Sequence, residues 1–208
     1  MLVKLPIEDF SQVLGSNSPA PGGGSVAALS GSLGANLVSM VCNLSIGKED
    51  YEAFRVELVE VLNQAQILSD SLLERVDLDT EAFNSVMAAF KMAKQTEDEK
   101  KARSEAIQMG FKEAVQSPLG IARECLEVLR LASNLLGKSN SSALSDLGVA
   151  SLQAYAGLEG AIMNVKINIP SIREENFTTD TSREISTLLD EGDRIRQFIY
   201  QYVSEKLA

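Results

Sequence analysis

The side chains available for proton transfer are few, because the 208-residue sequence contains no histidine. General acid–base chemistry therefore falls to Asp, Glu, Lys, Tyr or Cys. Asp146 is one of only two acids between residues 137 and 172, the other being Glu159. Because Asp146 follows the run SNSS, its charge could equally stabilise the N-terminus of a helix. The sequence leaves both roles open for this carboxylate.

A second set of ionisable residues flanks a predicted apolar helix. Asp77 and Asp79 lie in the stretch DLDTEAF at its start, and Lys94 lies at its end. Each charge complements the helix dipole, so each has a structural explanation. The same residues are also candidates for chemistry, because burial and nearby charges can adjust the pKa of a carboxyl or an amine.

Three glycines, Gly22, Gly23 and Gly24, stand before Ser25 and a long uncharged segment. Glycines permit a close approach of the backbone, and a helix N-terminus with free N–H groups can bind a carboxylate, phosphate or carbonyl oxygen. GGGSVA fits the dinucleotide pattern G-x-G-x-x-A formally, but no strand precedes it and no acid follows at the ribose distance. The alternative is a flexible turn with Ser25 near the helix start.

The elements that must position these residues are helices. Apolar residues recur at intervals of three and four with no period-two segment, which predicts an all-α bundle of seven or eight helices. Breaks are expected at the turn-forming runs, including SerPro at 117–118, and an amphipathic last helix from Asp180 is expected to cover the core. The periodic segments are 54–73, 82–92, 107–115 and 121–136.

Two segments, 25–46 and 143–165, are rich in small residues and are predicted to be central helices that a neighbouring helix or a second subunit approaches closely. The first is uncharged and about as long as a membrane span. Its seven Ser and Asn side chains, and the lack of a second such segment, argue against a span.

The composition predicts one domain, residues 1–208, in a reduced cytoplasmic protein. With 29 acidic and 19 basic residues the formal charge is -10, which removes the main attraction to nucleic acid and disfavours anionic membranes. Cys42 and Cys125 have no further Cys or His nearby in sequence to form a metal site or a disulfide framework. The N-terminal residues do not resemble a signal peptide.

Seven motifs follow one another along nearly the whole chain: SPAPGGGSVAA (18–28), SLGANLVSMV (32–41), DLDTEAF (77–83), KMAKQTEDEK (91–100), SPL (117–119), SDLGVAS (145–151) and NVKIN (164–168). In this order they resemble the formiminotetrahydrofolate cyclodeaminase family, which also includes bacterial methenyltetrahydrofolate cyclohydrolases. Two positions depart from the family pattern: Ala93 replaces a proline before Lys94, and Ser139 replaces a glycine before Asn140. The resemblance implies an all-helical fold that associates as a homodimer.

The resemblance also implies the reaction. Ring closure of 5-formiminotetrahydrofolate to 5,10-methenyltetrahydrofolate releases ammonia and requires no metal or other cofactor. The alternative within the family is methenyltetrahydrofolate cyclohydrolase, in which water attacks the same carbon. A non-enzymatic helical dimerisation or scaffold protein is the alternative outside it, and this alternative predicts no folate binding.

On this resemblance Asp146 is expected to transfer protons, with Lys94 as its partner or as an alternative acid, and Asp79 is expected to orient them. The glycine amides and Ser25 are expected to hold polar atoms of the folate or its glutamate carboxylate. Asn164 and Asn168 are weaker candidates, because polar residues late in a buried helix could simply bond one another. The expected substrate-binding residues are Gly22, Gly23, Gly24, Ser25, Asn140, Ser145 and Asn164.

Overall fold

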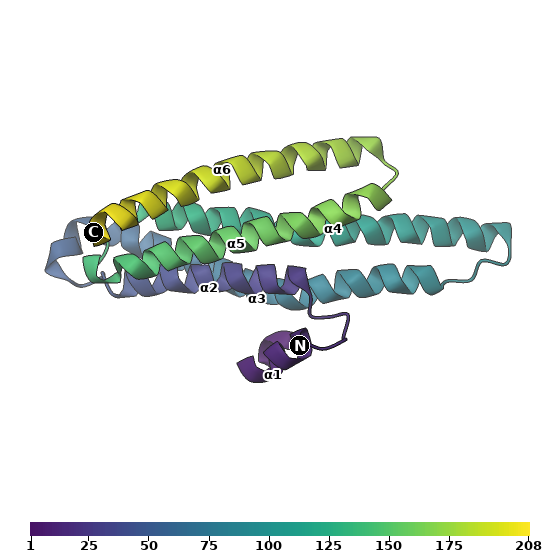
Figure 1. Cartoon of the computed structure of the whole chain (residues 1–208), viewed down its shortest axis with the longest axis horizontal. Coiled ribbons are helices and arrows are strands. Elements are labelled where there is room, and N and C mark those ends of the chain that lie inside the picture. The colour runs from purple at the N-terminus through teal and green to yellow at the C-terminus, as the bar shows by residue number, and fades with distance from the viewer.

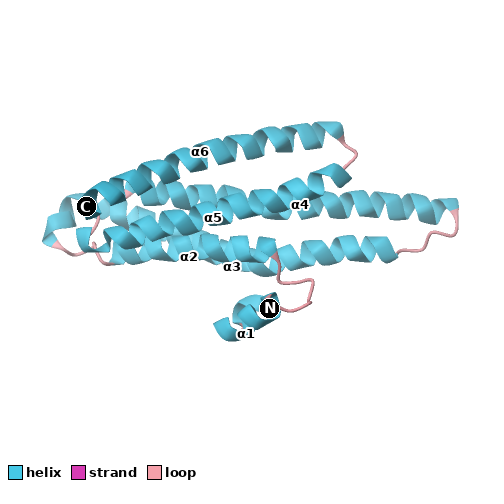
Figure 2. Ribbon diagram, in the orientation of Figure 1, coloured by secondary structure: helices cyan, strands magenta, loops and turns pink.

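The structure is a computed structural model that describes residues 1–208, and all of its regular elements are helical (Figures 1 and 2). The all-α class is therefore confirmed, but the α-helices number six, one fewer than the lower count expected. They are α1 (Ile7–Leu14), α2 (Gly23–Asn43), α3 (Arg55–Lys91), α4 (Glu97–Asn134), α5 (Leu144–Asn168) and α6 (Glu175–Leu207). Four short 3-10 turns are Leu2–Lys4, Glu49–Phe54, Ser141–Ala143 and Ile169–Ser171.

The count differs because α3 joins two segments that were expected to be separate helices. The acids of DLDTEAF, which are typical of a helix start, lie in the interior of α3. Buried side chains follow the helical period up to Val76 and resume at Val86. Between them the helix presents Asp79 to a cavity rather than an apolar side chain to the core, which is why the periodicity lapses there.

α4 likewise joins two segments that were expected to be separate helices, because it continues through the break expected at Ser117 and Pro118. A proline in a helix interior leaves the carbonyl four residues earlier without its usual N–H donor. Here that carbonyl belongs to Ala114, and it accepts a hydrogen bond from Asn168 Nδ2 at 3.3 Å. The side chain of a neighbouring helix thus replaces the missing donor.

The two helices rich in small residues are central, as expected. A Cβ atom placed on Gly34 would lie 2.9 Å from the carbonyl oxygen of Ala150, and one on Gly157 would lie 2.7 Å from that of Ala27. Glycine therefore permits α2 and α5 to touch through their backbones. α2 is long and apolar enough to cross a membrane by length and composition, but 61% of its most apolar window is buried within the bundle.

The remaining helices surround this pair. One cluster of 35 buried hydrophobic residues extends from α2 to α6, and α6 lies along α4 and α5 (Figure 1). The end of α3 and the start of α4 form a hairpin that projects beyond the start of α2 (Figure 1). The N-terminal turn is fastened to α3 by a hydrogen bond of 2.6 Å from the Leu2 amide to Asp77 Oδ1.

Candidate active site

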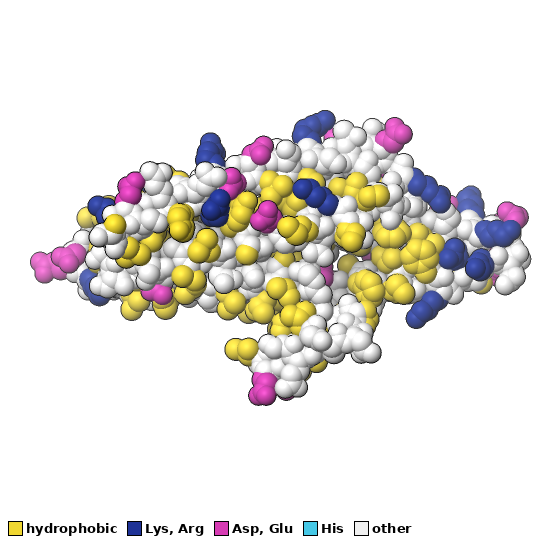
Figure 3. All heavy atoms as spheres, viewed as in Figure 1, with side chains coloured by type: hydrophobic (Ala, Val, Ile, Leu, Met, Phe, Trp, Pro, Cys, Tyr) yellow, Lys and Arg dark blue, Asp and Glu magenta, His cyan; other side chains and the backbone are white.

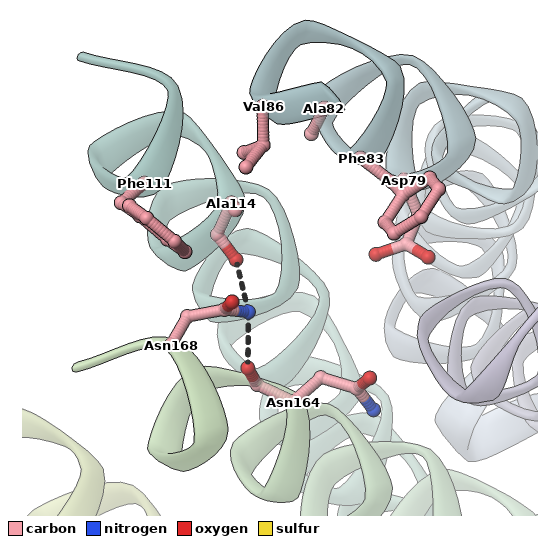
Figure 4. A pocket seen from close by; sticks show the side chains of 8 residues that line it. All are labelled: Asp79, Ala82, Phe83, Val86, Phe111, Ala114, Asn164 and Asn168. Atoms are coloured by element: carbon pink, nitrogen blue, oxygen red, sulfur yellow. Dashed lines mark hydrogen bonds between the residues drawn. The ribbon is translucent and has the colours of Figure 1, made fainter. Parts of the chain in front are cut away.

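A cavity of about 190 Å³ lies where α3, α4 and α5 meet, at the base of the projecting hairpin (Figure 4). Its polar lining consists of one carboxyl group, Asp79, and two amides, Asn164 and Asn168. The apolar lining consists of Ala82, Phe83, Val86, Phe111 and Ala114. An acidic group and two aromatic rings in one small cavity are suited to hold a flat, polar ring.

The glycines at the start of α2 stand directly behind this polar wall. A Cβ on Gly24 would overlap the carboxylate of Asp79, and one on Gly23 would lie 3.0 Å from Asn164 Nδ2. Any side chain at either position would push into a polar group of the cavity. The glycines therefore leave room for Asp79 and Asn164, which are contributed by two other helices.

The environment of Asp79 favours the protonated acid. Burial raises the pKa of its carboxyl group above the ordinary value, and a hydrogen bond from the backbone N–H of Ser25 offsets this only in part. A carboxyl group with a raised pKa exchanges protons more readily near neutral pH than an ordinary surface acid does. Asp79 is therefore equipped for proton transfer as well as for orientation.

Ser25 lies behind the cavity and does not line it. Its side chain is fully buried, and Oγ donates a hydrogen bond of 2.8 Å to the carbonyl oxygen of Val76. Ser25 thus joins the first turn of α2 to α3 at Val76, which is three residues before Asp79. Within the chain the hydroxyl of Ser25 bonds the backbone of α3 and its backbone N–H bonds the Asp79 carboxylate, whereas the sequence predicted that Ser25 would contact the ligand.

The two asparagines of α5 differ in their bonding. Asn164 Nδ2 donates to the carbonyl oxygen of Gly160 at 2.9 Å, one turn earlier in the same helix. Asn168 Nδ2 donates both to the backbone carbonyl oxygen of Asn164, at 2.9 Å, and to that of Ala114. The two side chains do not bond one another, which had been the structural alternative.

Asp146 lies far from this cavity within one chain. It belongs to the first turn of α5, whereas Asn164 lies eighteen residues later in the same helix. At the helical rise this separation is about 27 Å. Asp146 and Ser145 therefore lie at the end of the bundle that holds the C-terminus (Figure 1).

Asn140 belongs to the same distant end, and its side chain is engaged within the protein. It is buried, its Nδ2 donates to the carbonyl oxygen of Leu44 at 3.1 Å, and its Oδ1 accepts from the Ser142 amide at 3.1 Å. Asn140 therefore ties the loop before α5 to the end of α2.

Lys94 lies in the loop at the tip of the hairpin, three residues beyond the end of α3, and is exposed. Asp79 lies twelve residues before the end of that helix, about 18 Å along its axis. A single chain therefore does not bring Asp146, Lys94 and Asp79 together as expected.

The aromatic walls of the cavity were not among the predicted site residues. Phe83 carried a signal, since it lies one helical turn after Asp79 in the same motif, DLDTEAF. Phe111 carried none, because it reaches the cavity only through the antiparallel packing of α4 against α3.

Comparison with known proteins gives the family. The model of the Formiminotransferase-cyclodeaminase family matches residues 6–187. The chain belongs to this family. It is 42% identical over 201 residues to a methenyltetrahydrofolate cyclohydrolase of Methylorubrum extorquens, with 97% of each chain covered. It is 38% identical over 191 residues to the formimidoyltransferase-cyclodeaminase of Gallus gallus, of which it spans 35%.

Among solved structures, the family fold is matched by the crystal structure of formiminotetrahydrofolate cyclodeaminase from Thermotoga maritima. The TM-score is 0.83 at 26% identity, with 100% of this chain and 98% of that chain covered. The relatives of equal length and those about three times longer thus share this helical unit.

Proposed function

We propose that this family member is a folate enzyme that closes 5-formiminotetrahydrofolate to 5,10-methenyltetrahydrofolate and releases ammonia. The observation that carries the proposal is the carboxyl group of Asp79, which faces the cavity with a raised pKa. The name of the Thermotoga maritima neighbour supports the substrate. The volume of the cavity is about 190 Å³, which is below the ~300 Å³ of the smallest sites for drug-sized ligands. The cavity therefore suits the fused pterin ring of a folate rather than the whole molecule.

The reaction needs one proton to be moved. N10 attacks the carbon of the formimino group, whose nitrogen is protonated, a C–N bond forms to close the five-membered ring, and the bond to the departing nitrogen breaks. N10 loses a proton and the departing nitrogen gains one, so ammonia leaves. The Asp79 carboxyl group can accept the first proton and return it to the leaving nitrogen, and its negative form also stabilises the cationic methenyl carbon.

The second candidate reaction is cyclohydrolysis, which is favoured by the 42% identity to the Methylorubrum extorquens enzyme of the same length. Water attacks the methenyl carbon and gives up both of its protons, one to solvent and one to N5 as the ring bond to N5 breaks, and the formyl group remains on N10. Asp79 would accept a proton of the water. Both reactions thus require the same carboxyl group at the same carbon.

The assembly that we propose is a homodimer through the outer faces of α2 and α5. Apolar side chains on these faces are well exposed, among them Leu33, Leu152, Met163 and Ile167, and Figure 3 shows hydrophobic side chains spread over this side of the molecule. Two chains that each carry a charge of -10 repel one another, so a mainly apolar face, whose exposed charges on α5 are Glu159 and Lys166, is the surface best suited to contact a second copy. The negative charge also argues against nucleic-acid and anionic-membrane partners, and the two free, buried cysteines fit the proposal of a reduced, cytoplasmic protein. Asp146 and Lys94 would reach the cavity only from a second chain.

One experiment distinguishes the activities. Purified protein is offered 5-formiminotetrahydrofolate and, separately, 5,10-methenyltetrahydrofolate, and the near-ultraviolet absorbance of the methenyl form is followed. Appearance of that absorbance identifies the cyclodeaminase, and its accelerated loss identifies the cyclohydrolase. Absence of both activities, together with absence of folate binding, would leave the scaffold alternative.

A further inference from the structure

The proline in α4 creates an unusual hydrogen-bonding requirement at the wall of the cavity. Pro118 has no N–H, so the carbonyl oxygen of Ala114 lacks the partner that an α-helix normally provides. Ala114 itself lines the cavity. The replacement donor is the side chain of Asn168, the last residue of α5, whose Nδ2 lies 3.3 Å from that oxygen.

This requirement fixes which way the amide of Asn168 faces. Its Nδ2 donates to two carbonyl oxygens, those of Ala114 and Asn164, so both of its N–H bonds are used (Figure 4). A reversed amide would place Oδ1 against two acceptors and lose both bonds. The orientation is therefore decided by the protein before any ligand arrives.

The consequence concerns the other end of the amide. Oδ1 of Asn168 receives no hydrogen bond from the chain. This oxygen is not sealed inside the protein, so a ligand can reach it. Asn168 lines the cavity together with Asp79, whose carboxyl group accepts hydrogen bonds when it is ionised and can also donate one when it is protonated. The Oδ1 atom of Asn168 is thus a fixed acceptor at the cavity wall, and it selects a ligand edge that carries an N–H donor.

We propose that Asn168 is a ligand-binding residue that accepts a hydrogen bond from an N–H group of a reduced pterin ring, and that Pro118 is the positioning residue that orients its amide. This inference rests on the proposed folate function. The pterin ring of tetrahydrofolate carries an amino group and ring N–H groups, whereas the glutamate end of the molecule presents carboxylates. The Asn168 acceptor therefore assigns the ring end of the folate to the cavity, between the side chains of Phe83 and Phe111.

A double-mutant cycle tests this coupling. Pro118→Ala, Asn168→Ala and the double variant are compared with the wild type for the dissociation constant of 5-formyltetrahydrofolate, with kcat and the melting temperature measured alongside. In Pro118→Ala the new N–H can bond the Ala114 carbonyl, so this variant and the double variant keep a satisfied helix and should fold.

Asn168→Ala should weaken binding about five- to hundredfold, because a ligand donor loses its acceptor inside the cavity. Pro118→Ala should weaken binding about threefold or more while it maintains or raises the melting temperature, since it frees the amide of Asn168 to rotate. In the Asn168→Ala background the proline substitution should have no further effect on binding.

Equal weakening by Pro118→Ala in both backgrounds, or unchanged binding in Asn168→Ala, would overturn this inference and leave the proposed function intact. A wild-type protein that binds no 5-formyltetrahydrofolate and turns over neither folate would instead refute the proposed function, and the inference with it.

Discussion

The three adjacent glycines provide a graded test of the site, because the structure gives each a different neighbour. A Cβ on Gly22 would meet nothing closer than the carbonyl oxygen of Pro19, at 3.9 Å. One on Gly23 would lie 3.0 Å from the amide nitrogen of Asn164. One on Gly24 would lie 2.5 Å from Oδ2 of Asp79 and closer still to Oδ1. Alanine at these positions should therefore become more harmful in that order.

The magnitude for Gly24→Ala follows from the overlap. Ordinary contact of a Cβ begins at 3.4 Å, so the Asp79 carboxylate must move by about one ångström. A displacement of this size typically reduces turnover by about 10²-fold. Overpacking should also lower the free energy of unfolding by about 1–3 kcal/mol, partly offset by about 0.4–1 kcal/mol from the loss of glycine flexibility in the unfolded chain.

Gly22→Ala is the matched control. Gly22 has an extended backbone with φ at -130°, which alanine adopts without strain. Its turnover should equal that of the wild type. The assay measures kcat by the absorbance of the methenyl form and stability by urea unfolding. If Gly24→Ala were as active as Gly22→Ala, the position of the Asp79 carboxylate would not matter and our reasoning about the glycines would be refuted.

Three further predictions concern charge and assembly. Because burial raises the pKa of Asp79, the folded protein should lose stability as the pH rises from the pKa of this group in the unfolded chain through its raised pKa in the folded protein. Asp79→Asn removes this loss, so the gain in the free energy of unfolding that it gives should grow over that pH interval and stay constant at lower pH. Urea unfolding at several pH values measures it. Asp146→Asn should lower the free energy of unfolding by about 0.3–1 kcal/mol, and both it and Lys94→Met should keep kcat within about threefold; a fall of 10²-fold in either would show that a second chain brings the residue to the cavity. Light scattering at micromolar concentration should show a dimer that Leu152→Glu dissociates, and a monomeric wild type would contradict the proposed interface.

The fold class could be predicted from the sequence because helical periodicity and small-residue stripes are local patterns. The helix boundaries were harder, since two signals have other uses in this fold. The acids of DLDTEAF are typical of a helix start, yet Asp79 lies in mid-helix where the buried pattern gives way to the cavity. Pro118 is typical of a helix end, yet Asn168 supplies the donor that it lacks.

The site could be predicted only in part, because contacts between distant helices decide which candidates meet. Asp79 and Asp146 have similar local sequence contexts, and only packing places one in the cavity and the other at the far end of the bundle. The three-glycine motif was correctly singled out, but its neighbours on α3 and α5 lie more than fifty residues away in sequence. Phe111 could not be recognised at all without the antiparallel register of α3 and α4.

The central claim is that the carboxyl group of Asp79 transfers the proton in a folate reaction, and its most direct test is the turnover of Asp79→Asn. Asp77→Asn is the control, since Asp77 lies in the same motif but bonds the Leu2 amide away from the cavity. In Asp79→Asn kcat should fall by about 10²–10⁴-fold while the dissociation constant of 5-formyltetrahydrofolate changes little, and Asp77→Asn should retain near wild-type kcat. Turnover by Asp79→Asn at the wild-type rate would contradict the account.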